Sequence, residues 1–114
     1  MENKYSEEIK SVLKRTHPDL ATVHKLELKN FFGAITGYVD SNIFISCGNF
    51  GIALKLPVQT LEELFERKDV KHLRYFPKCH IKKEYAVLPK RITKDEKQFK
   101  KLIEESIEYV LQPS

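Results

Sequence analysis

The sequence predicts an α+β fold with two layers, in which helices cover one face of a mostly antiparallel sheet. Three observations lead to this prediction. Both ends of the chain carry hydrophobic residues at helical spacing. The region between residues 23 and 56 consists of β-rich runs separated by turns too short for a parallel crossover. A short helical pattern and two more β-rich runs then precede the last helix. We expect one domain over residues 1–114, in the order helix, three or four strands, helix, two strands, helix.

The first helix is predicted from a hydrophobic stripe and a start signal. The stripe consists of Tyr5, Ile9, Val12, Leu13 and Thr16. Ser6 is the expected N-cap, since serine is common there and the acids Glu7 and Glu8 follow it. Pro18 ends the helix, because the residue before a proline disfavours helical geometry.

The central region reads as a run of antiparallel hairpins. The expected strands cover residues 25–31, 34–39, 43–47 and 52–56. In the first of them, Leu26 and Leu28 alternate with charged residues. Residues 40–42 and 48–51 form the turns between the later strands. A meander of this kind needs no crossover helix.

The second half of the chain supplies two helices and two strands. Thr60–Glu63 has the form of a capping box and predicts a short second helix. The runs 73–76 and 85–88 are the expected strands, and a proline ends each. Thr93–Glu96 has the form of another capping box, and Pro113 follows the last helix. The stripe of that helix consists of Phe99, Leu102, Ile103, Ser106, Ile107, Val110 and Leu111.

Composition excludes several classes of protein. Hydrophobic residues make up 41% of the chain and charged residues 32%, which is ordinary for a globular domain. No apolar run approaches the ~20 residues that a membrane span requires. The first ten residues lack the hydrophobic segment of a secretory signal, and two cysteines do not make a disulfide framework. We therefore expect a cytoplasmic protein with reduced thiols and no membrane association.

The net charge of +4 is concentrated in residues 78–94. That segment carries Lys78, Lys82, Lys83, Lys90, Arg91 and Lys94 against the single acid Glu84. Such a segment is commonly a solvated loop, but it can also attract acidic partners. Together with Tyr75 and Phe76, it could hold single-stranded nucleic acid. Tyr85 lies in an apolar run and is expected in the core.

Phe31-Phe32-Gly33 forms a corner between two predicted strands. Alternation along a strand places one phenylalanine inward and the other outward. Gly33 permits a bend or a close approach that a side chain would block. The corner is either a core residue with a bend or an exposed aromatic anchor for a protein partner.

No motif in the sequence indicates catalysis, a metal or a cofactor. Cys79 and His80 are adjacent and would point to opposite sides of an extended segment, and no cysteine or histidine pair has zinc-site spacing. The basic setting of Cys79 could lower a thiol pKa, but no base and orienting group accompany it in the sequence. Residues 48–51 contain two glycines, but no helix follows them as in a phosphate-binding loop.

Several of these features resemble the N-terminal domain of the TfoX/Sxy competence regulators. The family's aromatic-glycine corner and its following strands match Phe31–Ala34, 37–44 and 52–57. Its downstream aromatic-proline region and its tyrosine strand match 75–77 and 85–89. A closing helix over 93–111 completes a resemblance that covers residues 6–111. Here Phe31 replaces the usual methionine and Ala34 the second glycine.

The resemblance implies a fold related in topology to secretion chaperones, and no established catalytic centre. The last helix is also similar to that of the YjbR family, which shares the two-layer fold. Full-length competence regulators carry a second, helical domain, so we expect a stand-alone domain rather than an activator of competence genes. The function that follows is a regulatory or protein-interaction module without catalytic activity, whose partner is another protein or a second copy. The alternative is a nucleic-acid-associated regulator that binds through residues 78–94.

Overall fold

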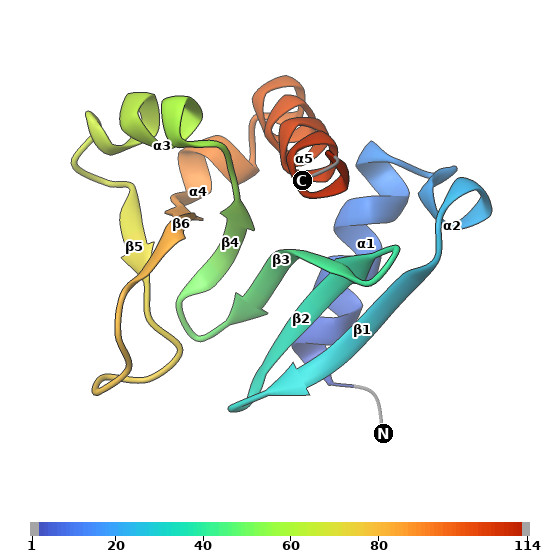
Figure 1. Cartoon of the computed structure of the whole chain (residues 1–114), viewed down its shortest axis with the longest axis horizontal. Coiled ribbons are helices and arrows are strands. Elements are labelled where there is room, and N and C mark those ends of the chain that lie inside the picture. Colours follow the sequence, from blue (N-terminus) through green and yellow to red (C-terminus); the bar gives the residue numbers. More distant parts are fainter. Residues whose placement is uncertain (1–2, 113–114) are drawn as a thin grey trace.

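The computed structural model describes residues 3–112 and confirms the α+β fold. Its strands are β1 (Leu26–Phe31), β2 (Ala34–Val39), β3 (Asn42–Gly48), β4 (Gly51–Lys55), β5 (Lys71–Leu73) and β6 (Lys82–Leu88). They form one sheet in the order β1-β2-β3-β4-β6-β5, and every neighbouring pair is antiparallel (Figure 1). The first four strands are therefore a meander, as the short turns predict.

The described helices pack on one face of this sheet. The helices are α1 (Lys4–Thr16), α2 (Leu20–Val23), α3 (Val58–Phe65), α4 (Lys90–Thr93) and α5 (Glu96–Leu111). The main hydrophobic core lies between the sheet and α1, α3 and α5, and it includes the fully buried Ile9, Phe44 and Ile103. Buried Ser106 ties α5 to the sheet, because its hydroxyl lies 3.0 Å from the Phe44 carbonyl oxygen and 2.6 Å from that of Lys55.

The opposite face of the sheet carries a second and smaller core. Ala53, Leu73, Tyr85 and Val87 are buried there, and Phe50 and Tyr75 pack against them. The loop of residues 74–81, between β5 and β6, provides the Tyr75 ring. Burial of Tyr85 confirms its expected core position, although it belongs to this second cluster rather than to the helical side.

Three predicted helix starts are wrong. Asn3, not Ser6, caps α1, because its side-chain oxygen accepts the Tyr5 backbone N–H at 2.8 Å. Helix α3 begins two residues before Thr60, directly after Pro57, and has no side-chain cap. The cap of α5 is Asp95, which accepts the backbone N–H of Gln98 at 3.2 Å.

Thr93 has a different role from the predicted cap. It ends the single-turn helix α4, where its hydroxyl donates to the Lys90 carbonyl at 3.4 Å. The strand expected at 73–76 is instead Lys71–Leu73, and the residues after it belong to the loop. Strand β6 begins three residues earlier than the expected run 85–88. Pro113 lies outside the described residues.

Candidate functional site

The β1–β2 hairpin ends in an aromatic turn. Phe32 and Gly33 connect the paired residues Phe31 and Ala34, with φ of 51° and 83°. Two successive positive φ values define a type I′ turn, which favours Asn-Gly or Asp-Gly. Phenylalanine is therefore strained at position 32, because L-residues other than Gly, Asn and Asp rarely adopt the left-handed region. Phe32 is nevertheless 66% exposed, so it lies on the surface and outside the main core.

Both phenylalanines of this corner are on the surface. Phe31 is 40% exposed, and neither ring enters the main core. The expectation of one inward and one outward side chain is therefore wrong. Phe32 occupies the turn rather than a strand position, so strand alternation does not apply to it. Both rings are accessible at the surface, and the exposed-anchor interpretation stays a prediction.

Five aromatic rings meet at this end of the molecule. Phe31 contacts Phe32 and Tyr75 edge-to-face, with ring centroids 4.6 Å and 4.7 Å apart. Phe32 contacts Phe76 in the same way at 4.8 Å. Phe50 joins through Tyr75 at 5.9 Å. We call Phe31, Phe32, Phe50, Tyr75 and Phe76 the aromatic cluster.

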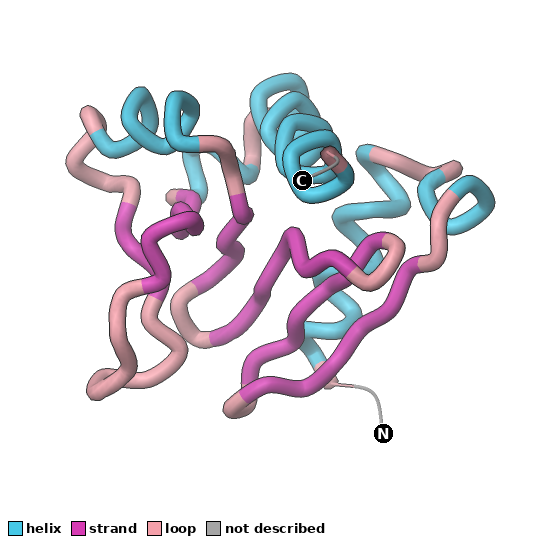
Figure 2. Tube along the Cα trace, viewed as in Figure 1, coloured by secondary structure: helices cyan, strands magenta, loops and turns pink. Residues whose placement is uncertain are grey.

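The cluster joins opposite edges of the sheet. Phe31 ends the edge strand β1, whereas Tyr75 follows the other edge strand, β5. Six strands in a flat sheet would separate these edges by roughly 24 Å. The contact requires a sheet that curls toward its helix-free face and a loop that reaches back over it. Figure 2 shows the β1–β2 turn and the β5–β6 loop at the same end of the molecule.

A hollow of about 300 Å³ lies on the curled face beside the cluster. It is lined by Phe31, Thr36, Tyr38, Ile43, Lys55, Tyr75, Lys82, Glu84 and Tyr85. The Tyr75 hydroxyl forms a 2.7 Å hydrogen bond with buried Ser46, and burial raises the pKa of Tyr75 above its usual value. Lys29 holds its ammonium 4.7 Å from the centre of the Tyr38 ring. The hollow thus combines aromatic walls and hydroxyls with the cation Lys82 and with Lys55, whose ammonium lies 3.6 Å from the Glu84 carboxylate.

The structure divides the basic segment 78–94 between two regions. Lys78 lies in the loop that also carries Phe76, and Lys82 lines the hollow with Phe31. Lys90 and Arg91 lie in α4, beyond the far end of β6. Seven residues of extended strand span roughly 20 Å, so the segment does not form one binding surface. Of the predicted cations, Lys78 and Lys82 are associated with the aromatic cluster.

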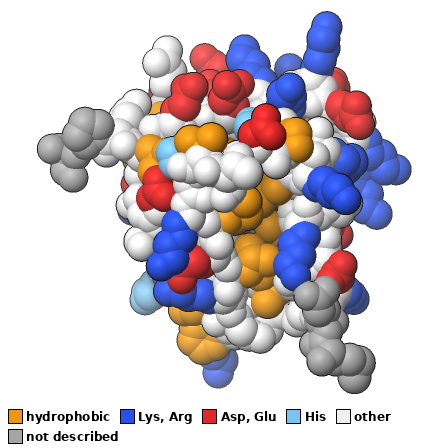
Figure 3. Space-filling model, turned by 90° about the vertical axis from the view of Figure 1, so that its right-hand side faces the viewer, with side chains coloured by type: hydrophobic (Ala, Val, Ile, Leu, Met, Phe, Trp, Pro, Cys, Tyr) orange, Lys and Arg blue, Asp and Glu red, His pale blue; other side chains and the backbone are white. Residues whose placement is uncertain are grey.

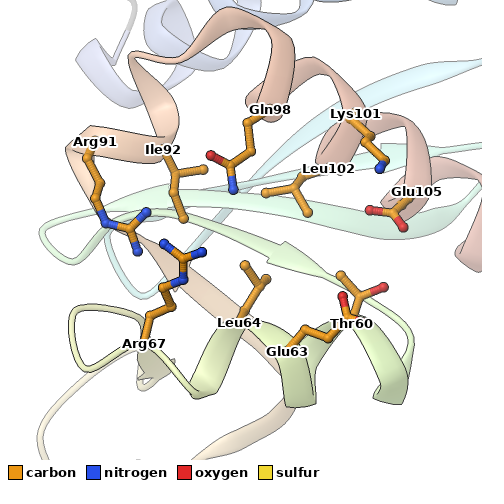
Figure 4. A pocket seen from close by; sticks show the side chains of 10 residues that line it. All are labelled: Thr60, Glu63, Leu64, Arg67, Arg91, Ile92, Gln98, Lys101, Leu102 and Glu105. Carbon is orange, nitrogen blue, oxygen red and sulfur yellow. The ribbon is translucent and has the colours of Figure 1, made fainter.

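Arg91 belongs to a cleft between α3 and the α4–α5 region (Figure 4). Its guanidinium donates to both carboxylate oxygens of Asp69, at 2.5 and 2.8 Å, and lowers the pKa of that carboxyl. Figure 4 also shows the Arg67 side chain pointing toward that of Arg91. Glu63 and Glu105 line the same cleft. Since carboxylates offset the arginines, this cleft is not a cationic anion site.

Lys83 borders a separate apolar groove of about 690 Å³. The groove lies beside α3, where the Phe65 ring stacks on His72 with centroids 4.2 Å apart. Exposed Val58 and Ile81 also line it. Neither charge nor hydrogen bonding at this groove specifies an occupant.

The two thiols show no catalytic arrangement within residues 3–112. Cys47 is buried on β3, and its thiol lies 3.3 Å from a Glu8 carboxylate oxygen. Burial, followed by the contact with Glu8, raises the pKa of Cys47 to about 12, so the thiol stays protonated. Cys79 is partly buried in the loop, and no group of three potential metal ligands exists among these described residues.

The sequence analysis does not single out Thr36 and Tyr38, which line the hollow, or Ser46, which forms the hydrogen bond with Tyr75. All three lie on strands and face the sheet side opposite the helices. The sequence does contain an indication of them: polar and aromatic residues alternate with buried hydrophobic residues along β2 and β3. The aromatic residues Tyr75 and Phe76 were noticed in the sequence, but their contacts with Phe31 and Phe32 were not predicted.

Comparisons of this chain with protein-family models, with curated proteins and with solved structures find no match. Among the described helices, none is both long and apolar enough to cross a membrane.

Proposed function

We propose that this protein is a cytoplasmic, non-catalytic protein-interaction module, similar to the N-terminal domain of TfoX/Sxy regulators, and that the aromatic cluster is its contact surface. The observation that carries the proposal is Phe32, a strained and 66% exposed aromatic residue at a turn that favours asparagine. Strained backbone positions concentrate at functional sites. Exposed aromatic anchors often dominate the energy of protein interfaces.

The neighbouring residues support a preformed surface. Edge-to-face contacts with Phe31 and Phe76 hold the Phe32 ring in place, so little side-chain entropy is lost on binding. Phe76 is itself 39% exposed, which extends the apolar area across the turn and the loop. These rings form one apolar patch with a hollow beside it.

Charge around the patch favours an acidic partner. Arg74 and Lys78 lie in the loop that carries Phe76, and Lys82 borders the hollow. Opposite charges at an interface rim mainly accelerate association and select the partner. The partner we propose is a protein segment with apolar side chains for the aromatic cluster and acidic residues beside them.

The same cations support the alternative of a nucleic-acid-associated regulator. Single-stranded nucleic acid binds to exposed aromatic rings that are flanked by lysine and arginine. The cluster has both features, although its rings contact one another edge-to-face rather than forming a row of open faces. Binding of this kind would weaken steeply with salt through counterion release.

Photo-crosslinking tests the proposal and separates the two partners. A benzoylphenylalanine at position 32 preserves an aromatic residue in the turn, and the same group at the exposed Lys97 on α5 is the matched control. We expect an adduct in cells from position 32 alone, removed by protease and resistant to nuclease. An adduct that nuclease removes would establish the alternative. No adduct from position 32, or equal adducts from both positions, would refute the aromatic surface.

A further inference from the structure

Within residues 3–112, no other strand pairs with the outer edge of β1. All six of its residues pair with β2 in continuous register, with no bulge. The other edge strand, β5, has three residues and a register shift between His72 and Leu73. In Figure 1, β1 forms the outer border of the sheet, beside α2. Regular edge strands of this kind are templates for pairing with another chain.

The backbone direction of β1 defines which groups point outward. The Lys25 carbonyl accepts the Asp40 backbone N–H at 2.8 Å, so the backbone of residue 25 is turned toward β2. Alternate residues of an antiparallel strand turn their hydrogen-bonding groups to opposite sides. The N–H and C=O groups of Leu26, Leu28 and Asn30 therefore point to the free edge.

We propose that a second copy of this chain pairs with this edge, antiparallel and with its two-fold axis at Leu28. Leu28 then faces Leu28 of the partner subunit, and each exchanges both hydrogen bonds with the other. Glu27 faces Lys29 of the partner subunit, and Lys29 faces the partner subunit's Glu27. An isologous two-fold interface requires this reciprocity. The two opposite-charge pairs occupy non-hydrogen-bonded positions, where side chains of antiparallel strands lie closest.

Two neighbouring registers, with the axis at Glu27 or at Lys29, would also keep the helices of both copies on the same side of the joined sheet. Charge disfavours both of them. An axis at Glu27 would place two Glu27 carboxylates opposite each other. An axis at Lys29 would place two Lys29 ammonium groups opposite each other. Like charges directly across a strand pair are destabilising. Only the axis at Leu28 replaces these repulsions with two attractions.

The flanking surface also suits a second copy. Leu26 and Leu28 are half-buried against the main core. Figure 3 shows hydrophobic side chains gathered on the side of the molecule that carries β1 and α2. Val23 on α2 is 72% exposed there. In the dimer, Phe31 faces Lys25 of the partner subunit, and a ring beside an ammonium is favourable. The inference is independent of the proposed function, because the edge pairing does not use the exposed ring of Phe32.

Charge reversal tests the interface. The wild type is expected to be a dimer by light scattering coupled to size exclusion at low salt. Glu27→Lys creates two pairs of facing lysines, and Lys29→Glu creates two pairs of facing glutamates. Each variant is expected to raise the dimer Kd by roughly tenfold to a hundredfold. An equimolar mixture restores both attractions and should form a heterodimer. The double variant Glu27→Lys/Lys29→Glu should form a homodimer as the wild type does.

The controls separate loss of pairing from loss of folding. Lys71→Glu makes the same charge change on the other edge strand and should leave the dimer intact. Circular dichroism on each single variant confirms that it is folded, and recovery on mixing shows this independently. A monomeric wild type at 0.1 mM would overturn the proposal. It would also be overturned if neither charge reversal changed the dimer Kd. The same holds if the two single variants formed no heterodimer on mixing. Since Phe32→Asn keeps the β1 edge, it should lose partner binding at the aromatic cluster but retain the dimer.

Discussion

Replacing Phe32 by alanine and by asparagine measures the strain in the aromatic turn. Both substitutions remove the ring and its contacts with Phe31 and Phe76. They differ in the backbone, because asparagine tolerates the left-handed region much better than alanine does. The free energy difference between the two variants therefore reports the strain at position 32, where φ is 51°.

The magnitudes follow from exposure and conformation. With 66% of Phe32 exposed, about a third of a ~200 Å² aromatic surface is buried, worth about 1.7 kcal/mol as an upper value. Phe32→Ala loses this and keeps the strain, so we expect destabilisation by about 1.5 kcal/mol. Phe32→Asn also loses the ring but relieves about 1 kcal/mol of backbone strain, so its free energy of unfolding should be close to that of the wild type. The Tm of the asparagine variant should exceed that of the alanine variant by about 5 °C.

Urea unfolding of both variants gives the difference directly. Phe76 is the matched control, because it belongs to the same cluster and its backbone is not left-handed. Phe76→Asn should therefore have no advantage over Phe76→Ala. If Phe32→Asn is no more stable than Phe32→Ala, or if the control shows the same gain, the argument from strain is wrong. A nearly neutral Phe32→Asn that also abolishes partner binding would show that the phenylalanine is retained for binding.

Three further predictions test the packing around the site. Gly37→Ala should destabilise the protein by about 1–3 kcal/mol in urea unfolding, because the new Cβ would lie 2.6 Å from Ile45 Cγ2; a neutral variant would contradict the close approach. Ser106→Ala should reduce the unfolding free energy by about 1–2 kcal/mol with an unchanged m-value, since buried carbonyls lose their hydroxyl donor. Iodoacetamide at pH 8 should modify Cys79 alone in the native protein, because the pKa of Cys47 is about 12; mass spectrometry that finds native Cys47 alkylated would contradict this.

The sequence contains enough local information to predict the sheet but less to predict its helix starts. Strand 34–39 agrees residue for residue, because hydrophobic runs and tight turns determine the hairpins. The capping-box pattern predicts helix starts less well. Thr60 and Thr93 fit the pattern, but the residues directly before α3 and α5 are Pro57 and Asp95. Several residues near a helix end can serve as cap, and tertiary packing decides among them.

The candidate site depends on contacts that no local pattern contains. Phe31 and Tyr75 are 44 positions apart in the chain and meet only because the sheet curls and a loop returns over it. Conversely, Lys78 and Arg91 are near in sequence but separated by the length of β6. Sequence analysis could identify the aromatic residues and the cations. Sheet curvature decides which of them form one surface.

The two turns that flank β2 provide an internal comparison for the role of Phe32. Both have positive φ at two successive residues, which are Phe32 and Gly33 in one and Asp40 and Ser41 in the other. Asp40 suits its turn: its carboxylate accepts the Lys25 backbone N–H at 2.8 Å, and that bond and a second one to His24 lower its pKa. Phe32 makes no comparable bond, yet the same fold would accept asparagine there. Since departures from local preference concentrate at functional positions, we propose that this strained and exposed ring is retained for binding.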